Sequence, residues 1–228
     1  MHDLVSKIAV LFLLLGACLL PLSSTAVASS DLPIQAGKKV IVLGASGSLA
    51  KYVIDMLAKD KSIQLTLFLR DKSRLRNDNV GEARIVEGDV FEYDGLRNAI
   101  RGQDVVYANL SGDLGKMAKN IVKAMNETEV KQLIFICSIG IYNEPVKPVL
   151  VPYRQAADVI EASNLDYTIL RPTWFSEVDE VDYEITKKGE PEKGSVVSRK
   201  SIATFIGEVI NHPQNYKRQS LGINKPKS

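Results

Sequence analysis

The chain has very few histidine residues, and they do not cluster. Of its 228 residues only two are histidine, and His2 and His212 lie near opposite ends of the sequence. A zinc site needs several clustered histidine, cysteine or carboxylate ligands, and a serine triad needs a histidine base. The sequence therefore predicts no metal site and no hydrolase that depends on a histidine.

Cysteine is also scarce, with only Cys18 and Cys137 in the whole sequence. Cys18 falls in an N-terminal segment that has the layout of a removable signal. Once that segment is removed, Cys137 has no partner for an internal disulfide. Because Cys137 lies within the apolar run LIFIC, we expect a small buried side chain.

The chain has almost no excess of one charge. It carries 29 Lys and Arg against 27 Asp and Glu, a net charge of +2, and no basic cluster interleaved with aromatic residues. Nothing in this composition points to nucleic acid as a partner. With 45% hydrophobic and 25% charged residues, and no internal repeat, the sequence instead predicts one α/β domain with a full core.

Residues 1–28 differ from the rest of the chain. Lys7 precedes an almost wholly apolar run, IAVLFLLLGACLL, and the small residues Ala26, Val27 and Ala28 follow before Ser29. A basic start, a short apolar core and a small-residue cleavage site are typical of a secretory signal peptide. The sequence therefore divides into a signal peptide at 1–28, a tether at 29–37 and a folded domain at 38–228.

Other fates of this segment stay open. The sequence LGAC, ending at Cys18, is similar to the lipobox of bacterial lipoproteins, which would make Cys18 a lipid anchor. An uncleaved segment would associate the protein with a membrane, although the apolar run is short for a span. A misassigned start codon would leave the protein in the cytoplasm, whereas the signal peptide predicts export to the periplasm or cell surface.

The stretch KKVIVLGASGSLA, from Lys38 to Ala50, carries the strongest motif. Val40 to Leu43 form an apolar run that is typical of a strand buried on both faces. A turn containing Gly44 and Gly47 follows, and apolar residues then recur at helical spacing. A strand, a glycine turn and a helix form half of a dinucleotide-binding unit, in which glycines let the backbone approach a pyrophosphate. The alternative is a tight turn before an ordinary helix.

Apolar strand patterns alternate with helical patterns along the rest of the domain. We expect further strands near residues 64–69, 84–87, 105–109, 132–138, 165–172 and 221–223. This alternation predicts a doubly wound parallel sheet with helices on both faces, a Rossmann fold. The segment from Thr173 to Val197 has no regular pattern, so we expect a small irregular region beyond the carboxyl edge of the sheet, where substrates bind in such folds. A solvated surface loop is the alternative.

The end of the second strand bears on the choice of cofactor. Arg70 stands there, and Lys72 and Arg74 follow it. An acidic residue at this position binds the ribose hydroxyls of NAD, whereas an arginine pairs with the 2′-phosphate of NADP. The sequence therefore predicts NADP as the cofactor, with a solvated basic loop as the alternative.

Five segments in order resemble a known family: GASGSLA, Arg70, Gly88-Asp89-Val90, CSIGIY and LDYTILRP. Together they are similar to the atypical short-chain dehydrogenase/reductases, and most similar to their NAD(P)H-binding, NmrA-like branch. The similarity runs from about Lys38 to Ile223. The resemblance implies a Rossmann fold that binds NAD(P).

The resemblance also implies roles for particular residues. The pyrophosphate would contact the glycine turn and the start of the next helix, at Gly44, Ser46, Gly47, Ser48 and Leu49. Arg70 would face the ribose phosphate, and Asp89 with Val90 would edge the adenine. The remaining cofactor contacts would come from Asn109 and Leu110 along its length, and from Ser138 at the nicotinamide end.

The catalytic residues match the family less well. Active members of the wider superfamily use a serine after the fifth strand and a tyrosine with a lysine four residues later, which lowers the tyrosine pKa. Ser138 fits the first role, but neither Tyr142 nor Tyr153 has a lysine four residues later. We expect Ser138 to orient the acceptor and either Tyr142 or a water to supply the proton. A structural role for Tyr142 is the alternative.

Two functions follow from these features, and whether the protein is an enzyme stays open between them. The first is an NADP(H)-dependent oxidoreductase acting on a small carbonyl, quinone or flavin-like acceptor. The second is a non-catalytic NADP(H)-binding redox sensor, which the missing lysine favours. A third class, an exported scaffold without nucleotide, follows from the signal peptide because NADP is chiefly a cytoplasmic molecule.

Overall fold

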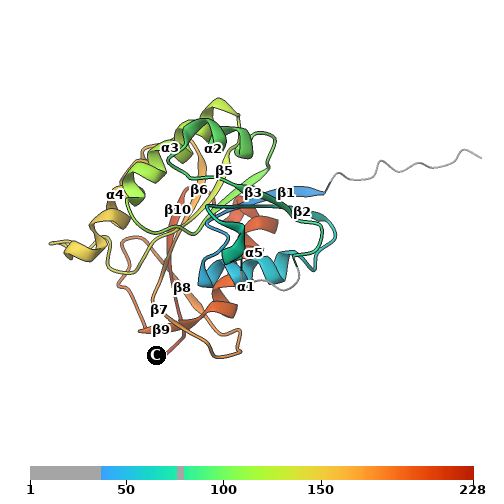
Figure 1. Cartoon of the computed structure of the whole chain (residues 1–228). Coiled ribbons are helices and arrows are strands. Elements are labelled where there is room, and N and C mark those ends of the chain that lie inside the picture. The colour runs from blue at the N-terminus through green and yellow to red at the C-terminus, as the bar shows by residue number, and fades with distance from the viewer. Residues whose placement is uncertain (1–36, 76–79) are drawn as a thin grey trace, which may run out of the picture. The chain divides into compact units, whose positions relative to one another are not determined.

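The computed structural model describes residues 37–75 and 80–228, which form ten strands and five α-helices (Figure 1). The strands are β1 (Lys38–Leu43), β2 (Ile63–Leu69), β3 (Arg84–Glu87), β4 (Val105–Ala108), β5 (Gln132–Ile136), β6 (Asp166–Pro172), β7 (Trp174–Ser176), β8 (Glu184–Lys187), β9 (Val196–Ser198) and β10 (Gln219–Asn224). The helices are α1 (Ser48–Leu57), α2 (Tyr93–Ile100), α3 (Leu114–Glu127), α4 (Val151–Glu161) and α5 (Arg199–Asn211). The predicted signal peptide and all but the last residue of the tether lie outside the described residues.

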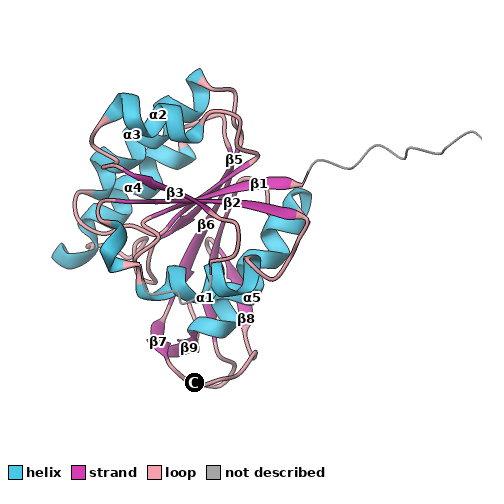
Figure 2. Cartoon of the chain, turned by 45° about the vertical axis from the view of Figure 1, so that its right-hand side comes forward, coloured by secondary structure: helices cyan, strands magenta, loops and turns pink. Residues whose placement is uncertain are grey.

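Eight strands form the main sheet, in the order β3-β2-β1-β4-β5-β6-β10-β8. Every neighbouring pair is parallel except β10 and β8, which are antiparallel at one edge. Helices α2, α3 and α4 cover one face, and α1 and α5 cover the other (Figure 2). This arrangement confirms the predicted doubly wound sheet.

Burial on both faces explains the unbroken apolar runs within the central strands, such as Val40 to Leu43 in β1. Alternate side chains of a strand point to opposite faces. Ile41 and Leu43 accordingly pack into the core shared with α2, α3 and α4, while Val40 and Val42 pack into the core shared with α1 and α5. Cys137 is 3% exposed and belongs to the first of these cores, as predicted for a small buried side chain.

The strand order reverses between β1 and β4. The chain leaves β1 toward β2 and β3 on one side, and later continues from β4 to β5 and β6 on the other. The two sets of connections diverge at this point, so a crevice opens outside the carboxyl ends of β1 and β4. The glycine turn after β1 and the residues after β4 therefore face the same crevice.

The segment after β6 is more regular than the sequence predicts. Strands β7 and β9 form a separate parallel pair, and β8 adds an antiparallel strand to the main sheet beside β10. Strand β8 pairs with β10 and so covers an edge of β10 that would otherwise expose a row of unpaired backbone groups. The strands are only three or four residues long, which is why no periodic pattern marks them in the sequence.

Candidate cofactor site

The glycine turn after β1 is held against the end of β4. Gly44 has a φ of +82°, and a Cβ added there would lie 2.2 Å from the carbonyl oxygen of Asn109. A Cβ at Gly47 would lie 2.5 Å from the side-chain nitrogen of Asn109. Gly44 therefore requires glycine, because it has a positive φ and the backbone of β4 lies too close for a side chain, whereas a side chain at Gly47 would require the Asn109 amide to move.

The turn leads into a helix whose N-terminus has no side-chain cap. Gly47 is the N-cap residue of α1, so no side chain accepts hydrogen bonds from the first backbone N–H groups. Asp113 caps α3 and Ser198 caps α5 through such bonds, whereas α2 and α4 lack a side-chain cap as α1 does. The free N–H groups of α1 and the partial positive charge of its N-terminus are thus left for an anion.

A cavity of about 190 Å³ opens at this turn. Its walls come from the carboxyl ends of β1, β2, β3 and β4, as expected for the crevice at the reversal of strand order. Most of the predicted cofactor residues line it: Gly44, Ser46, Gly47, Arg70, Asp89, Val90, Asn109 and Leu110. Ser48 and Leu49 lie in the first turn of α1 without lining the cavity, and the Leu49 side chain is buried in the core.

Two arginines line the cavity at the end of β2. Arg70 and Arg74 form no ion pair with any residue in the described ranges, whereas the Lys72 ammonium lies 3.6 Å from the Glu87 carboxylate. Sequence reasoning named all three cations, but only the fold separates the paired lysine from the two arginines. Arg74 is within electrostatic reach of the Asp71 carboxylate, whose pKa is lowered by hydrogen bonds within its own turn and further by Arg74, but neither arginine is held in a close ion pair among the described residues. Two guanidinium groups beside a cavity fit a phosphate group.

The segment after β3 forms the opposite wall. A Cβ at Gly88 would lie 2.8 Å from the Phe68 ring, so glycine lets this segment pack directly on β2. The Asp89 carboxylate accepts a hydrogen bond from the Phe91 N–H at 2.9 Å, which fixes the turn into α2. Val90 is buried. The predicted pair of Asp89 and Val90 therefore lies at the cavity, with the carboxylate of Asp89 bound to its own turn.

Ser138 lies at the same carboxyl edge but does not line this cavity. It follows β5 by two residues, and the preceding Cys137 N–H donates to the Leu170 carbonyl of β6 at 2.7 Å. The Ser138 hydroxyl donates to the Ile139 carbonyl at 3.1 Å. The structure thus places Ser138 between the ends of β5 and β6, and its role toward an acceptor stays a prediction.

The Tyr142 hydroxyl is bound on the α4 and β10 side of the sheet. It lies 2.7 Å from the Glu161 carboxylate and 2.9 Å from the Ser220 hydroxyl. Burial raises the pKa of Tyr142 above its usual range, and the hydrogen bond to Glu161 adds to this effect. A phenol held neutral in this way is a weak proton donor. These contacts favour a role for Tyr142 in holding the fold together, and its catalytic role stays a prediction.

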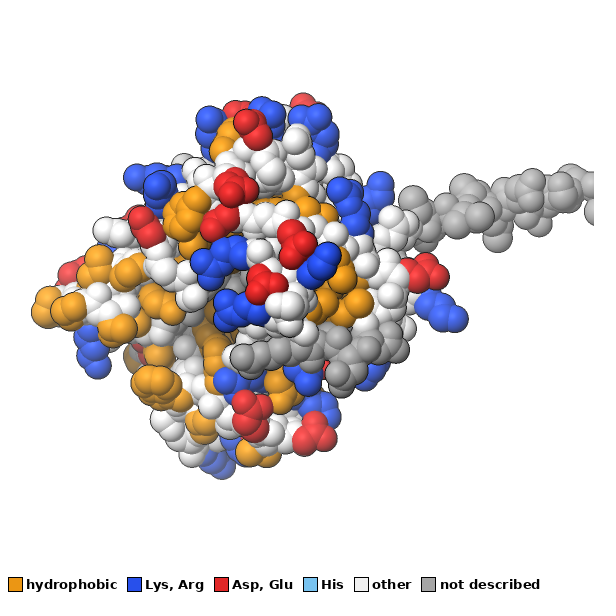
Figure 3. Space-filling view, viewed as in Figure 1, with side chains coloured by type: hydrophobic (Ala, Val, Ile, Leu, Met, Phe, Trp, Pro, Cys, Tyr) orange, Lys and Arg blue, Asp and Glu red, His pale blue; other side chains and the backbone are white. Residues whose placement is uncertain are grey.

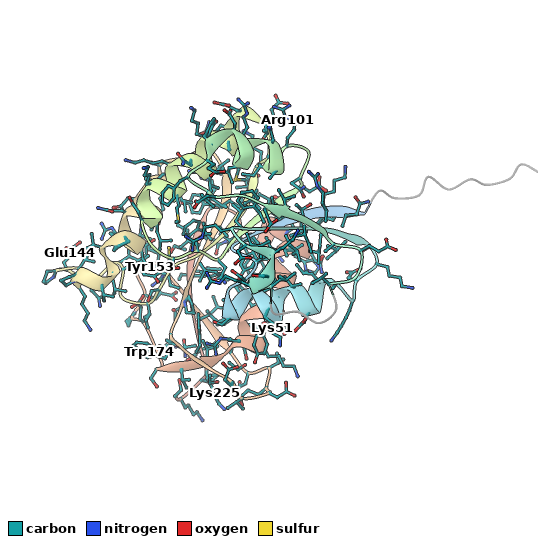
Figure 4. All side chains as sticks on the ribbon, viewed as in Figure 1. Lys51, Arg101, Glu144, Tyr153, Trp174 and Lys225 are labelled. Atoms are coloured by element: carbon teal, nitrogen blue, oxygen red, sulfur yellow. The ribbon has the colours of Figure 1, made fainter. Side chains whose placement is uncertain are left out.

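A second tyrosine, Tyr153, was set aside by sequence reasoning because Ala157 replaces the family lysine. It lies in the first turn of α4, at the end of that helix that faces the carboxyl edge of the sheet (Figure 4). The Cys137 thiol lies 3.6 Å from the Tyr153 carbonyl, so Tyr153 is next to the Ser138 segment. Its hydroxyl has no hydrogen-bond partner among residues 37–75 and 80–228. The helix start after the fifth strand was the signal that could have marked it.

Exposed apolar side chains flank this part of the edge (Figure 3). Val149 is 73% exposed in the segment that leads into α4, and Trp174 is 82% exposed at the start of β7. Both segments follow strands whose carboxyl ends lie at the edge, β5 and β6. No helix in the described part of the chain is long and apolar enough to cross a membrane.

Comparison with known proteins places the chain among NAD(P)H-binding proteins. A family model described as NAD(P)H-binding matches residues 44–213. A tobacco protein, isoflavone reductase homolog A622 of Nicotiana tabacum, is 23% identical over 212 residues that cover 79% of this chain and 66% of that protein. The chain therefore spans about two thirds of the length of this curated relative.

Two solved structures are similar over most of their length. A Rossmann-fold NAD(P)-binding family protein from Shigella flexneri is 44% identical, with a TM-score of 0.77, and the match covers 84% of this chain and 95% of that one. A short-chain dehydrogenase/reductase from Veillonella parvula, solved in complex with NADP, is 26% identical with a TM-score of 0.77. That match covers 83% of this chain and 95% of the Veillonella chain.

Proposed function

Because the chain belongs to the NAD(P)H-binding family, we propose that it is an NADP(H)-dependent oxidoreductase of the atypical short-chain, NmrA-like type. Its acceptor is a small carbonyl, quinone or flavin-like molecule. The observation that carries the proposal is that Arg70 and Arg74, which form no close ion pair within the described residues, line the cavity at the uncapped N-terminus of α1. The NADP-bound Veillonella structure and the reductase name of the tobacco relative support it.

The residues of the cavity fit such a cofactor. The free N–H groups at the start of α1 would bind the pyrophosphate, and Arg70 with Arg74 would bind the 2′-phosphate. Val90 would cover the adenine, while Asn109 would lie along the cofactor beside the glycine turn. When bound, the cofactor supplies a hydride for transfer to the acceptor.

The chain's own residues would orient the acceptor and provide a proton. Ser138 stands between the ends of β5 and β6, where its hydroxyl would hold the acceptor oxygen. The candidate proton sources are Tyr153, Tyr142 and water. Tyr153 is favoured because its hydroxyl has no partner among the described residues, whereas Glu161 and Ser220 hold the hydroxyl of Tyr142.

The rim of the edge favours an apolar acceptor. Val149 and Trp174 are largely exposed on the segments that follow β5 and β6, and Phe175 is 37% exposed beside Trp174. Exposed apolar groups at a ligand-binding edge bury their surface when an apolar molecule binds. A flat quinone or flavin-like molecule would be bound more tightly here than a small polar carbonyl.

The cofactor assignment is tested by the melting temperature of the full chain with NADPH, NADP⁺, NADH and NAD⁺. A ligand present at about a hundred times its dissociation constant adds about 2.7 kcal/mol of stability. We expect stabilisation by the phosphorylated cofactors, reduced in Arg70→Ala and kept in Arg101→Ala, whose side chain lies at the far end of α2 (Figure 4). No shift with any of the four would contradict the proposal.

A non-catalytic redox sensor is the second candidate. The observation that favours it is that neither Tyr142 nor Tyr153 is followed four residues later by a lysine, the spacing that active members of the superfamily use. Such a protein would bind NADPH and NADP⁺ with different affinities and oxidise NADPH with no member of an acceptor panel. Equal affinities for the two forms, or turnover of any acceptor, would exclude the sensor.

We also propose export through the N-terminal segment, and the N-terminal residue of the mature protein tests it. Mass spectrometry of protein purified from its own organism should find Ser29 at the N-terminus. An acylated Cys18 would instead indicate a lipoprotein, and an intact Met1 would indicate either a retained anchor or a cytoplasmic protein. Membrane fractionation separates these last two.

A further inference from the structure

Arg171, next to last in β6, is the largest fully buried side chain in the described part of the protein. It is 2% exposed and pairs through Nη1 with the carboxylate of Glu192, which is itself 19% exposed. Its Nε and Nη2 atoms are buried and have no hydrogen-bond partner among the described residues. Three N–H groups of a permanent cation therefore point at no acceptor.

The hydroxyl of Thr173 has the same property. Thr173 is 6% exposed, and its Oγ1 atom has no partner in the described ranges. Residues two apart along an extended chain share one face, so Thr173 and Arg171 present their side chains to the same side. Native proteins rarely leave buried donors unpaired, because each such group loses its hydrogen bonds to water without gaining others. Buried donors without partners on the same side of the chain indicate a site for an acceptor atom.

Glu192 already shows how a carboxylate binds there. One of its oxygens pairs with Arg171, and the other accepts the backbone N–H of Gly140 at 2.8 Å. A guanidinium group and a backbone N–H on the two oxygens of one carboxylate are strong, charge-assisted donors. Glu192 comes from the connection between β8 and β9, where Gly189 and Gly194 both have positive φ. The carboxylate is thus supplied by a loop rather than by the sheet.

This site lies at the edge where the acceptor is expected. Gly140 is two residues beyond Ser138, and Arg171 is at the carboxyl end of β6. The Arg171 guanidinium lies 5.2 Å from the centre of the Tyr142 ring, whose hydroxyl is fixed by Glu161 and Ser220. The hydrogen bonds of the hydroxyl fix the Tyr142 ring, and the ring in turn helps to hold the guanidinium in place. Arg171 is therefore a preformed cation next to the Ser138 segment.

We propose that Arg171, the Gly140 N–H and the Thr173 hydroxyl form a carboxylate subsite for the acceptor, which Glu192 occupies until the acceptor binds. The inference rests on the proposed function and narrows its substrate class. The acceptor is an apolar molecule that bears a carboxylate group. Its carboxylate displaces Glu192, and its apolar part lies against the rim that includes Val149 and Trp174.

A purely structural ion pair is the competing explanation, and Glu192→Gln separates the two. The glutamine fills the same space but no longer competes for Arg171 as an anion. If the subsite is open to ligands, an added carboxylate will bind the variant better than the wild type. If the pair is only structural, the variant loses stability and gains no affinity for carboxylates.

The probe is 4-fluorobenzoate, followed by its ¹⁹F NMR signal with the full chain, both alone and with an excess of NADP⁺. We expect Glu192→Gln to bind it about tenfold more tightly than the wild type, a difference of about 1.4 kcal/mol. The neutral 4-fluorobenzamide should bind neither protein measurably. Glu190→Gln, which changes an exposed carboxylate of the same loop, should behave as the wild type.

The double variant Arg171→Met, Glu192→Gln removes the cation without leaving the Glu192 carboxylate unpaired. It should lose the affinity for 4-fluorobenzoate while keeping a cooperative melting transition. Equal binding of the probe by wild type and Glu192→Gln, or binding retained by the double variant, would overturn the proposal. So would equal affinity for the benzoate and the benzamide.

The same samples separate this inference from the proposed function. If NADPH stabilises the protein and the probe does not bind Glu192→Gln, the carboxylate subsite is wrong and the cofactor site stands. If the probe binds as expected but no nicotinamide cofactor stabilises the chain, the subsite survives as an anion site and the oxidoreductase is wrong.

Discussion

The carboxyl edge of the sheet has two parts, one at the glycine turn after β1 and one after β5 and β6. They differ in how far apart in the sequence their contacting groups lie. At the glycine-turn end, short segments directly after β1, β2, β3 and β4 form the cavity, and each carries a recognisable motif. At the β5–β6 end, Gly140 contacts Glu192 across 52 residues and Tyr142 contacts Ser220 across 78. The close contacts at the glycine-turn end involve mainly backbone groups, whereas those at the β5–β6 end involve mainly side chains.

This difference has a physical origin. Binding of a pyrophosphate needs only N–H groups and close approach, which a glycine turn before a helix supplies locally. Selection of an acceptor needs charges and surfaces of particular shape, which the fold assembles from loops on separate strands. The first end is therefore tested best by changes of backbone, and the second by exchanges of single functional groups.

The largest expected effect is at the backbone of the glycine-turn end. Gly44→Ala would place a side chain at φ +82° and 2.2 Å from the Asn109 carbonyl oxygen. The left-handed conformation alone costs about 1–2 kcal/mol, and the contact with backbone adds to it. We expect a loss of more than about 2 kcal/mol in urea unfolding, together with loss of NADPH binding.

Gly102→Ala is the matched control for this change. Gly102 also has a positive φ, +74°, but a Cβ there meets nothing within 4 Å. It should lose only the conformational part of the stability and bind NADPH as the wild type does. If both variants lose the same stability and keep NADPH binding, the close approach to Asn109 does not matter for the site.

The next effect concerns the two arginines. Loss of both guanidinium groups in Arg70→Ala, Arg74→Ala should lower the ratio of NADPH to NADH affinity by about a hundredfold, because a hydrogen bond to a charged group contributes about 1.5–3 kcal/mol. Isothermal titration with both cofactors measures this ratio. Lys72→Ala should change it little, since Lys72 faces Glu87. A larger effect at Lys72 than at the arginines would reverse the assignment.

The β5–β6 end is tested by exchanging the two tyrosine hydroxyls. General acid catalysis contributes roughly 10²–10⁴-fold, so Tyr153→Phe should lower the turnover of an accepted substrate by at least about a hundredfold. Tyr142→Phe should leave turnover within a few-fold of the wild type and cost about 1 kcal/mol of stability, since its hydroxyl is held by Glu161 and Ser220. The opposite pattern would restore Tyr142 as the proton donor.

The smallest effect is a dependence of stability on alkaline pH. The pKa of Tyr142 is raised from 10.0, chiefly by burial, so the unfolded chain loses this proton before the folded protein does. The contribution to stability is complete below about pH 10 and is lost as the pH rises above that value. The unfolding free energy of Tyr142→Phe should fall less steeply above about pH 10 than that of the wild type. An equal pH dependence of the unfolding free energy in both proteins would show that the pKa of Tyr142 is not raised by folding.

Several features of the protein could be predicted from local sequence. The alternation of strands and helices predicted the doubly wound sheet, and Lys38–Leu43 followed by the glycine turn predicted the first unit. Arg84–Glu87 was predicted with its observed bounds, directly before Gly88. Such predictions succeed where a short segment contains both the sequence pattern and the residues whose structure that pattern determines.

The predictions were weaker wherever distant segments meet. The segment from Thr173 to Val197 was expected to be irregular, yet it contains β7, β8 and β9, whose pairing depends on partners elsewhere in the chain. Tyr142 was chosen as a proton donor for its position after β5, although contacts with α4 and β10 decide where its hydroxyl points. Tyr153 was passed over because one spacing was missing.

The sequence by itself determined the fold class, the glycine turn and the cations after β2, because strand burial, turn geometry and helix N-termini act within a few residues. Only the tertiary structure decided which cations stay unpaired, which tyrosine hydroxyl is held, and that Arg171 lies buried against Glu192 with donors to spare. Those outcomes depend on burial and on partners brought from distant strands, and neither is encoded in any single segment.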